Sequence, residues 1–271
     1  LDEIIVTAEK RSASLQDVPI SISAFSGDRL EQSGITESLD LEMVTPGLSF
    51  GVNARGGKIF IRGIGASTLG GPGTDPSASV YIDGVYQGRD SSVFVDLLDI
   101  ERIEVLKGPQ GTLYGRNSTG GAIKYISKGP DKEFGGNIKA EFGNYNLSVL
   151  TATLDTPLVE DKLLLRTSVT KKDRDGYMEI INQSGDDNDR DDLLAGRLTL
   201  QYLPTDNLNI VMHAAAVNDD GDVRGVKQEV DTTSGQVSTA QIISDPRKMA
   251  SDLAAAKTPL RNRTYDITVN W

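Results

Sequence analysis

Glycines in the middle of the chain have a spacing that could hold a phosphate group. They are Gly111, Gly115, Gly120 and Gly121. A phosphate-binding loop needs the pattern GxxxxGK followed by Ser or Thr, with a strand before it and a helix after it. The stretch that begins at Gly111 does not fit this pattern, so nucleotide binding is disfavoured. The glycines instead indicate close backbone packing or positive φ angles.

An acidic run, DDNDRDD, invites a calcium interpretation. Asp187, Asp189 and Asp191 have the 1, 3, 5 spacing of a calcium-binding loop. Position 6 is Asp192, where such a loop needs glycine, and position 12 is Leu198, where it needs glutamate. We therefore interpret the run as a solvated acidic loop and predict no metal site in it.

The chain offers few groups for catalysis. It contains no cysteine and a single histidine, His213, which falls on the same strand face as Asn209 and is expected to face water. A triad or dyad would have only His213 to draw on, and a metal site would need partners that the sequence does not supply. We predict no catalytic residue, no metal and no cofactor, and we class the chain as not an enzyme.

The glycines lie in the stretch 100–127, IERIEVLKGPQGTLYGRNSTGGAIKYIS. Residues that favour strands fill 100–106, and Gly108-Pro109 ends that strand by supplying a flexible turn residue and removing a backbone donor. After the glycine-rich loop, 122–126 resumes the alternation of a strand. The stretch is predicted to be a compact strand-turn-strand unit and not a linker.

The head of the chain carries an apolar, β-branched run in otherwise polar surroundings. The run consists of Glu3, Ile4, Ile5, Val6, Thr7 and Ala8. Either it is a frayed strand, or it pairs with the sheet edge of a partner, where backbone hydrogen bonds supply affinity and side chains supply selectivity. The residues alone leave both alternatives open.

Apolar and polar residues alternate strictly in the second half of the chain. In 262–271, for example, Tyr265, Ile267 and Val269 fall on one face and polar residues on the other. The alternation predicts strands at 135–143, 147–156, 163–173, 193–203, 208–217 and 262–271. A soluble sandwich alternates as a membrane barrel does, so the periodicity alone does not separate the two.

The lengths of the connections favour the barrel. If the first of these strands climbs away from the periplasm, the periplasmic connections are short, and they are 157–162 and 204–207. Two of the outer connections are long, and the three are 144–146, 174–192 and 218–261. Short periplasmic turns and long outer loops are typical of outer-membrane barrels. Tyr202 and Trp271, near the lower strand ends, suit the aromatic girdle of such a barrel.

Charge and hydropathy disfavour other classes. The chain has 39 acidic and 28 basic residues and a net charge of −11, which disfavours a nucleic-acid partner. No apolar run approaches the roughly 20 residues of a membrane helix, and no signal peptide is present. If the chain crosses a membrane, we expect it to do so as a β-barrel. Leu1 is expected to be a processed N-terminus.

The stretch 100–127 resembles the C-terminal half of the plug domain of TonB-dependent outer-membrane receptors. Two earlier stretches, 58–65 (KIFIRGIG) and 79–88 (SVYIDGVYQG), are similar to the strand-and-turn motifs of that plug. The opening, 15–50, resembles the start of the plug. The resemblance places a first strand, helical pieces and a turn at 18–22, 27–41 and 46–48. It covers residues 1 to about 130 in order, which a chance motif would not do.

The resemblance implies an α+β plug domain followed by antiparallel transmembrane β-barrel strands. These would be the N-terminal portion of a plugged barrel of about 22 strands. The implied divisions are a TonB box and linker at 1–14, a plug at 15–132, and the first six or so strands of an incomplete barrel at 133–271. The remaining strands would come from further sequence or a second chain, because an open edge in lipid leaves backbone groups unsatisfied.

The resemblance also assigns sites. The run from Glu3 to Ala8 looks like the TonB box, which implies pairing with TonB, the periplasmic end of an energising complex in the inner membrane. Arg62 and Lys107 match plug positions whose cations pair with carboxylates on the barrel wall, and a lysine at the second position lacks the two-pronged geometry of arginine. A plug loop would face the substrate. Its candidate contacts are Ser67, Thr68, Leu69, Thr74 and Asp75.

The function implied by the resemblance is active transport across the outer membrane of a Gram-negative bacterium, with lipid around the barrel. A small-molecule substrate binds above the plug, TonB pairs with the box, and the plug rearranges. The expected cargo is a ferric siderophore or another iron complex. Alternatives that stay open are TonB-dependent uptake of cobalamin, haem, a sugar or an aromatic compound, a transport-linked signal transducer, and a passive porin or adhesin.

Overall fold

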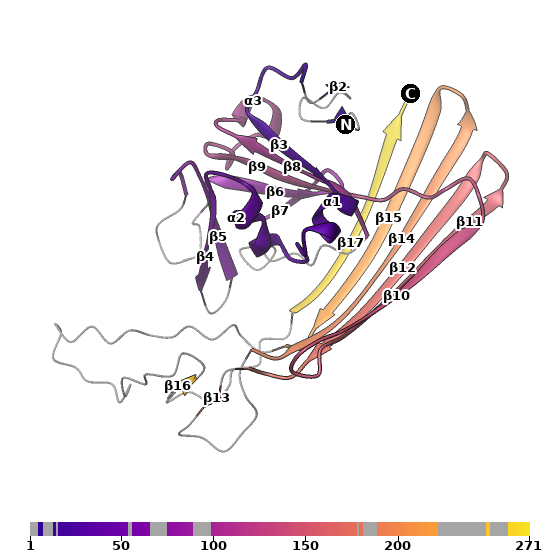
Figure 1. Ribbon diagram of the computed structural model, residues 1–271. Helices are drawn as coiled ribbons and strands as arrows, with labels where there is room; N and C mark the ends of the chain where they lie inside the picture. Colours follow the sequence, from indigo (N-terminus) through magenta and orange to yellow (C-terminus); the bar gives the residue numbers. More distant parts are fainter. Residues whose placement is uncertain are drawn as a thin grey trace. The chain divides into compact units, whose positions relative to one another are not determined.

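The computed structural model describes residues 5–7, 13–14, 16–53, 56–65, 75–88, 99–177, 179–180, 189–221, 248–249 and 260–271. The chain divides into two compact units, Leu1–Lys128 and Gly129–Trp271, each with its own main sheet (Figure 1). Within the described residues, no helix is long and apolar enough to cross a membrane.

The first unit is built on a five-stranded sheet with the order β3-β8-β9-β6-β7. The strands are β3 (Ile22–Ser26), β6 (Ala78–Ile82), β7 (Val85–Gln87), β8 (Ile100–Lys107) and β9 (Gly121–Ser127). β6 and β9 run parallel, and the other neighbours are antiparallel. The central strands β8 and β9 come from the stretch that the sequence predicts as strand-turn-strand, so that prediction is confirmed.

β8 is buried on both of its faces. Ile103 and Val105 pack in the main hydrophobic core, and Leu106 packs in a second, smaller cluster. Glu104 lies in the same strand and is also fully buried. A buried carboxylate is costly unless it is paired and hydrogen-bonded, so the environment of Glu104 decides what this part of the sheet can do.

Short helical segments and two strand pairs complete the first unit. The segments are α1 (Gly27–Gln32), the 3-10 helix η1 (Ser38–Asp40), α2 (Leu41–Val44) and α3 (Gly111–Tyr114). The antiparallel pairs are β1 (Ile5–Val6) with β2 (Ala13–Ser14), and β4 (Leu48–Asn53) with β5 (Gly56–Ile61). Ser26 caps α1 by accepting a hydrogen bond from the Arg29 N–H at 3.3 Å.

Two local predictions about the first unit are wrong. The sequence predicts a first strand at 18–22, but 19–20 form a bend, 18 and 21 are irregular, and β3 begins at Ile22. Pro19 has no N–H to donate to a sheet, which explains the later start. The predicted glycine-rich loop contains the helical turn α3, which ends at Gly115 with a φ of 76°.

Gly121 sets how closely β8 and β9 approach each other. It lies opposite Lys107 in the register, and its φ is 148°. A Cβ atom at this position would lie 2.1 Å from the carbonyl oxygen of Leu106. No side chain fits in that space, so this glycine is required by packing.

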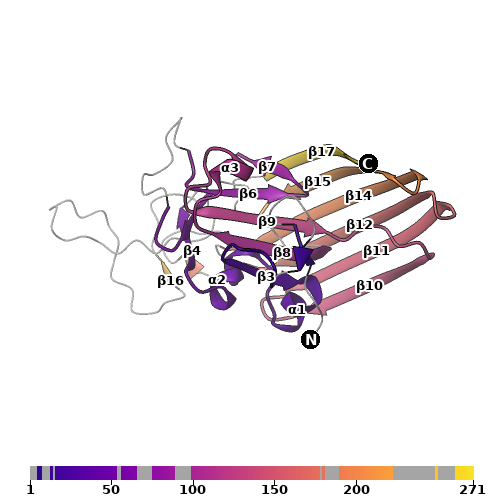
Figure 2. The ribbon, with the colours of Figure 1, turned by 90° about the horizontal axis from the view of Figure 1, so that it is seen from above.

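The main sheet of the second unit has six antiparallel strands in the order β10-β11-β12-β14-β15-β17 (Figure 2). The strands are β10 (Gly135–Phe142), β11 (Ser148–Val159), β12 (Leu163–Arg174), β14 (Asp191–Thr205), β15 (Leu208–Asp219) and β17 (Leu260–Asn270). The alternation in the sequence predicts all six. It does not predict the short parallel pair β13 (Glu179–Ile180) and β16 (Lys248–Met249).

The connections sort by length between the two edges of this sheet. Those after β11 and β14 are short, at 160–162 and 206–207. The connections at the opposite strand ends are 143–147, 175–190 and 220–259. The predicted division into one edge of short turns and one edge with two long connections is therefore present.

The six-stranded sheet has one apolar face and one polar face. Large apolar side chains on one face are exposed, among them Ile138, Leu150, Leu198 and Tyr265. The other face carries buried polar side chains, among them Asp155, Ser168, Thr170 and Thr199. An apolar exterior over a polar interior is the pattern of a transmembrane barrel wall.

Candidate functional site

The structure describes half of the predicted box. Glu3, Ile4 and Ala8 lie outside the described residues. Ile5, Val6 and Thr7 are described.

The described part of the box is docked on the first unit. Ile5 and Val6 form β1, which pairs with β2. Val6 is fully buried, and it packs in the cluster that contains Leu106 and Ala122, while Ile5 is exposed. Burial of an aliphatic side chain of this size stabilises such docking by about 1.5–3 kcal/mol.

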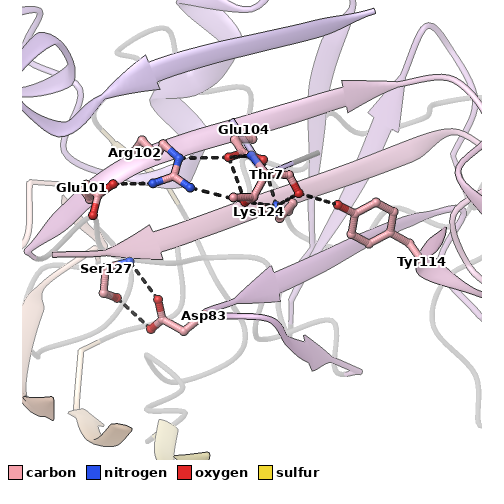
Figure 3. Close-up of polar contacts among 8 residues, drawn as sticks. All are labelled: Thr7, Asp83, Glu101, Arg102, Glu104, Tyr114, Lys124 and Ser127. Atoms are coloured by element: carbon pink, nitrogen blue, oxygen red, sulfur yellow. Dashed lines mark hydrogen bonds and ion pairs between the residues drawn. The ribbon is translucent and has the colours of Figure 1, made fainter. Parts of the chain in front are cut away.

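A buried ion pair contacts the residue that follows β1. Glu104 of β8 and Lys124 of β9 are opposite each other in the sheet, with Lys124 Nζ 2.9 Å from Glu104 Oε2. Arg102, two residues before Glu104, donates from Nε to Glu104 Oε1 at 3.0 Å and also pairs with Glu101. We call Glu104, Lys124 and Arg102 the box cluster (Figure 3).

All polar groups of Thr7 are bonded to the box cluster (Figure 3). The backbone N–H of Thr7 donates to Glu104 Oε1 at 2.8 Å, and its hydroxyl donates to the same oxygen at 3.2 Å. The Thr7 carbonyl oxygen accepts from Lys124 Nζ at 2.8 Å. The Thr7 hydroxyl oxygen accepts from Lys124 Nζ at 2.7 Å and from Arg102 Nη2 at 3.3 Å.

The electrostatics of the cluster favour an ionised Glu104. Burial by itself would raise the pKa of Glu104, but the charge of Lys124 and the hydrogen bonds from Lys124, Thr7 and Arg102 outweigh it. The pKa of Glu104 therefore lies below its ordinary value. Burial lowers the pKa of Lys124, and the charge of Glu104 opposes that effect.

Tyr114 at the end of α3 borders the cluster. The centre of its ring lies 6.0 Å from Lys124 Nζ, and its hydroxyl makes a long, 3.5 Å contact with the Thr7 carbonyl oxygen. Tyr81 donates from its hydroxyl to the Tyr114 carbonyl oxygen at 2.7 Å, which fixes the end of the helix. Burial raises the pKa of Tyr114, so its hydroxyl stays neutral.

Arg62 and Lys107, the predicted lock cations, are both tied to Ser21. Arg62 Nη2 donates to the Ser21 hydroxyl at 2.8 Å, and the Lys107 backbone N–H donates to the Ser21 carbonyl at 2.9 Å. Burial, and then the charge of Arg62, lower the pKa of Lys107. Among the residues with a described placement, neither cation forms an ion pair with a carboxylate. The lock to the barrel wall stays a prediction.

The predicted substrate loop falls mostly outside the described residues. Ser67, Thr68, Leu69 and Thr74 belong to the undescribed stretch 66–74. Asp75 starts the next described stretch and is exposed.

The second unit changes the interpretation of two candidates. His213 Nδ1 lies 2.8 Å from Asp266 Oδ1 on the neighbouring strand, so the histidine is paired and does not only face water. Asp191 and Asp192 belong to β14 and not to a solvated loop, and they pair with cations of β12, with Arg174 Nη2 2.9 Å from Asp191. No group of three metal-binding side chains occurs among the described residues.

The sequence carries only a weak signal for the box cluster, and no motif in the sequence identifies it. Arg102 and Glu104 stand at alternate positions of a strand whose neighbours are apolar, and Lys124 interrupts the apolar segment AIKYI. Charged residues at buried strand positions of adjacent segments are the pattern that would have indicated a paired site. What no periodicity predicts is that Thr7, far away in the chain, completes it.

A sequence model described as the TonB-dependent Receptor Plug Domain matches residues 14–122. Residues 14–122 are therefore a plug domain of the kind found in TonB-dependent receptors. The box cluster and the lock cations therefore lie in, or directly beside, the plug domain. This family consists of receptors and transporters, not enzymes.

Two curated relatives show what the chain is similar to. The pesticin receptor of Yersinia pestis is 29% identical over 210 residues, which are 75% of this chain and 30% of that receptor. The ferrioxamine B receptor of Salmonella typhimurium (strain SL1344) is 30% identical over 206 residues, which are 62% of this chain and 28% of that receptor. The chain thus spans less than a third of the length of these relatives.

A solved structure agrees with the fold. The ferric yersiniabactin uptake receptor FyuA from Yersinia pestis superimposes with a TM-score of 0.75 at 23% identity, over 92% of this chain and 38% of that chain. The likeness covers both units, the plug domain and the antiparallel strands. The predicted fold class, a plug domain followed by the first strands of a plugged barrel, is confirmed.

Proposed function

We propose that this chain is the N-terminal portion of an outer-membrane active transporter that imports a ferric siderophore or a similar iron complex. The energy comes from TonB, which pairs with the box at residues 3–8. The single observation that carries the proposal is a plug domain with the described box residues docked on its sheet. A passive porin needs neither feature.

The exposed apolar face of the six-stranded sheet supports the location. Side chains such as Ile138 and Tyr265 would contact lipid, and the polar face would line the lumen of the barrel. Because six strands do not close a large barrel, the remaining strands come from further sequence or a second chain. The membrane is then the outer membrane of a Gram-negative bacterium.

The cargo class rests on the names of relatives. They are called receptors for pesticin, ferrioxamine B and catecholate siderophores, and two of these three names refer to iron chelators. We extend that class to this chain. The plug loop with Ser67, Thr68, Leu69, Thr74 and Asp75 is the proposed substrate floor.

The mechanism follows from the parts in place. Substrate binding above the plug frees the box, TonB adds a strand to it, and traction on the box rearranges the plug. Arg62 and Lys107 are the proposed lock to carboxylates of the barrel wall. Breaking one buried ion pair leaves an uncompensated charge, which is unfavourable. The pairs are therefore expected to break together, and the plug would be released cooperatively.

The test is uptake of radiolabelled iron by cells that carry the full receptor or a receptor without residues 2–8. A panel of ferric hydroxamates, ferric catecholates, cobalamin and sugars identifies the cargo. We expect uptake of one ferric chelate, lost both on deletion of the box and on dissipation of the proton gradient. Uptake that survives the deletion would contradict active transport, and energised uptake of only a non-iron compound would replace the cargo.

A further inference from the structure

The hydrogen bonds of Thr7 and Lys124 are mutually complete. Lys124 has three ammonium protons, and its partners are the Thr7 carbonyl oxygen, the Thr7 hydroxyl oxygen and Glu104 Oε2. The Thr7 hydroxyl has one proton, given to Glu104, and two lone pairs, which accept from Lys124 and Arg102. All three protons of the Lys124 ammonium group and all donor and acceptor positions of the Thr7 hydroxyl are thus used within this contact.

This completeness conflicts with the pairing that TonB requires. A partner strand binds through the backbone N–H and C=O groups of the segment it joins. Both backbone groups of Thr7 are held by side chains of the plug, and β1 is already paired with β2. A partner strand that extends through Thr7 must first displace Glu104 and Lys124.

We propose that the box cluster is a latch that recognises Thr7 and sets how readily TonB reaches the box. The inference deepens the proposed function and rests on it. Glu104, Lys124 and Arg102 are positioning residues for the partner strand, because they act on TonB only through the box.

The latch has two states, with the box docked or detached, because Thr7 and the ion pair of Glu104 and Lys124 satisfy each other's hydrogen bonds. When the box leaves, Lys124 keeps one of its three acceptors, and Glu104 loses both bonds from Thr7. Glu104 is fully buried, so partial loss of its donors is unfavourable until water enters. The box is therefore expected to detach as a unit, with Val6 leaving its cluster at the same time.

The contact selects the residue at position 7. A side-chain hydroxyl is needed both to donate to Glu104 and to accept from Lys124 and Arg102. Valine has the shape of threonine but neither capacity, so Thr7→Val would leave a buried ammonium proton without an acceptor. Serine keeps both capacities, so Thr7→Ser would keep the latch.

The test is made on the full receptor, purified without substrate, with the double variant Glu104→Gln/Lys124→Met. The double change removes both charges together, which avoids a lone buried ion, and keeps the side-chain sizes similar. We expect the affinity for the periplasmic domain of TonB, measured by calorimetry, to rise about tenfold through loss of the hydrogen bonds from Lys124 to Thr7. With the transported iron chelate bound, the double variant and the parent should bind alike.

Two further single variants serve as a graded test and as a control. Arg102→Gln, at the rim of the cluster, is expected to raise the affinity about threefold, because it removes only one weaker bond to Thr7. Lys128→Met removes an exposed ion pair with Asp28 in the same unit, and it should leave the affinity unchanged. Circular dichroism melting checks that each variant is folded.

A second readout separates the latch from the proposed function. Residues 1–271 contain no cysteine, so once any cysteine elsewhere in the full receptor is replaced by serine, a spin label on Ile5→Cys reports the mobility of the box alone. Higher label mobility in the folded double variant, together with tighter TonB binding, supports the latch. A folded double variant with the label mobility and the TonB affinity of the parent overturns it. If the label is freed but TonB binds none of the proteins in either substrate state, the contact stands and the proposed function fails.

Discussion

Two groups of cations on the plug differ in where their charge is balanced. In the box cluster, Lys124 and Arg102 surround Glu104 of their own sheet, and Thr7 completes the contact. Arg62 and the Lys107 backbone instead both contact the neutral Ser21, and burial, followed by the charge of Arg62, lowers the pKa of Lys107.

We call the contact of Thr7 with the box cluster the first joint, and the pair of Arg62 and Lys107 the second joint. The box cluster is self-sufficient within the first unit, so it can hold the box whatever the rest of the receptor does. Arg62 and Lys107 carry like charges and do not stabilise each other. This fits the prediction, implied by the family resemblance, that their carboxylate partners lie on the barrel wall. One strand, β8, carries Glu104 of the first joint and Lys107 of the second, on opposite faces.

The largest loss of local stability is expected when the charge of Glu104 in the box cluster is removed alone. Glu104→Gln leaves Lys124 buried without its counter-ion and should reduce the free energy of opening of β8 and β9 by about 3–5 kcal/mol. Hydrogen exchange of the β8 and β9 amides in the full receptor measures this loss. Glu101→Gln, the same change at a half-exposed position of the same strand, should cost less than about 1 kcal/mol. Equal losses in the two variants would contradict the picture of a buried, coupled pair.

A smaller loss is expected where the two joints meet in the sheet. Gly121→Ala would bring a Cβ to 2.1 Å from the Leu106 carbonyl oxygen and place alanine at a φ of 148°. The two strands must then separate locally, at a cost of about 1–3 kcal/mol. Because Gly121 lies opposite Lys107, both joints should loosen together, seen as faster exchange on both sides of β8. Gly129→Ala, where a Cβ meets nothing within 4 Å, is the matched control.

The sequence predicts the strands that carry these residues better than it predicts the contacts between their side chains. Alternation predicts all six strands of the main sheet of the second unit, because the two faces of those strands meet environments of opposite polarity. The resemblance places the central strands of the plug. It does not place β3 correctly, since Pro19 shifts its start, and no sequence pattern identifies Glu104 and Lys124 as a pair. Long-range pairing of two buried charges leaves no periodic trace in the sequence.

The pH dependence tests the box cluster through Glu104. The folded pKa of Glu104 is lowered, so its contribution to stability is fully present above the unfolded value near 4.5 and is lost as the pH falls through the folded value. Spin-label mobility at Ile5→Cys should therefore rise in acid below about pH 4.5. In the Glu104→Gln background this acid step should vanish. An unchanged step in that background would assign the titration to another carboxylate.

The smallest expected effect concerns the incomplete joint. Lys107→Arg supplies a fork that can hold a carboxylate with two hydrogen bonds, while it keeps the charge beside Arg62. If the barrel wall provides that carboxylate, the full receptor should gain about 0.2–1 kcal/mol against release of the plug in urea. The same substitution should leave the box label at Ile5→Cys unaffected, because the box cluster balances its charge without Lys107. A gain in the urea midpoint that is matched by a less mobile box would show that β8 couples the two joints; no gain at all would mean that Lys107 faces no carboxylate.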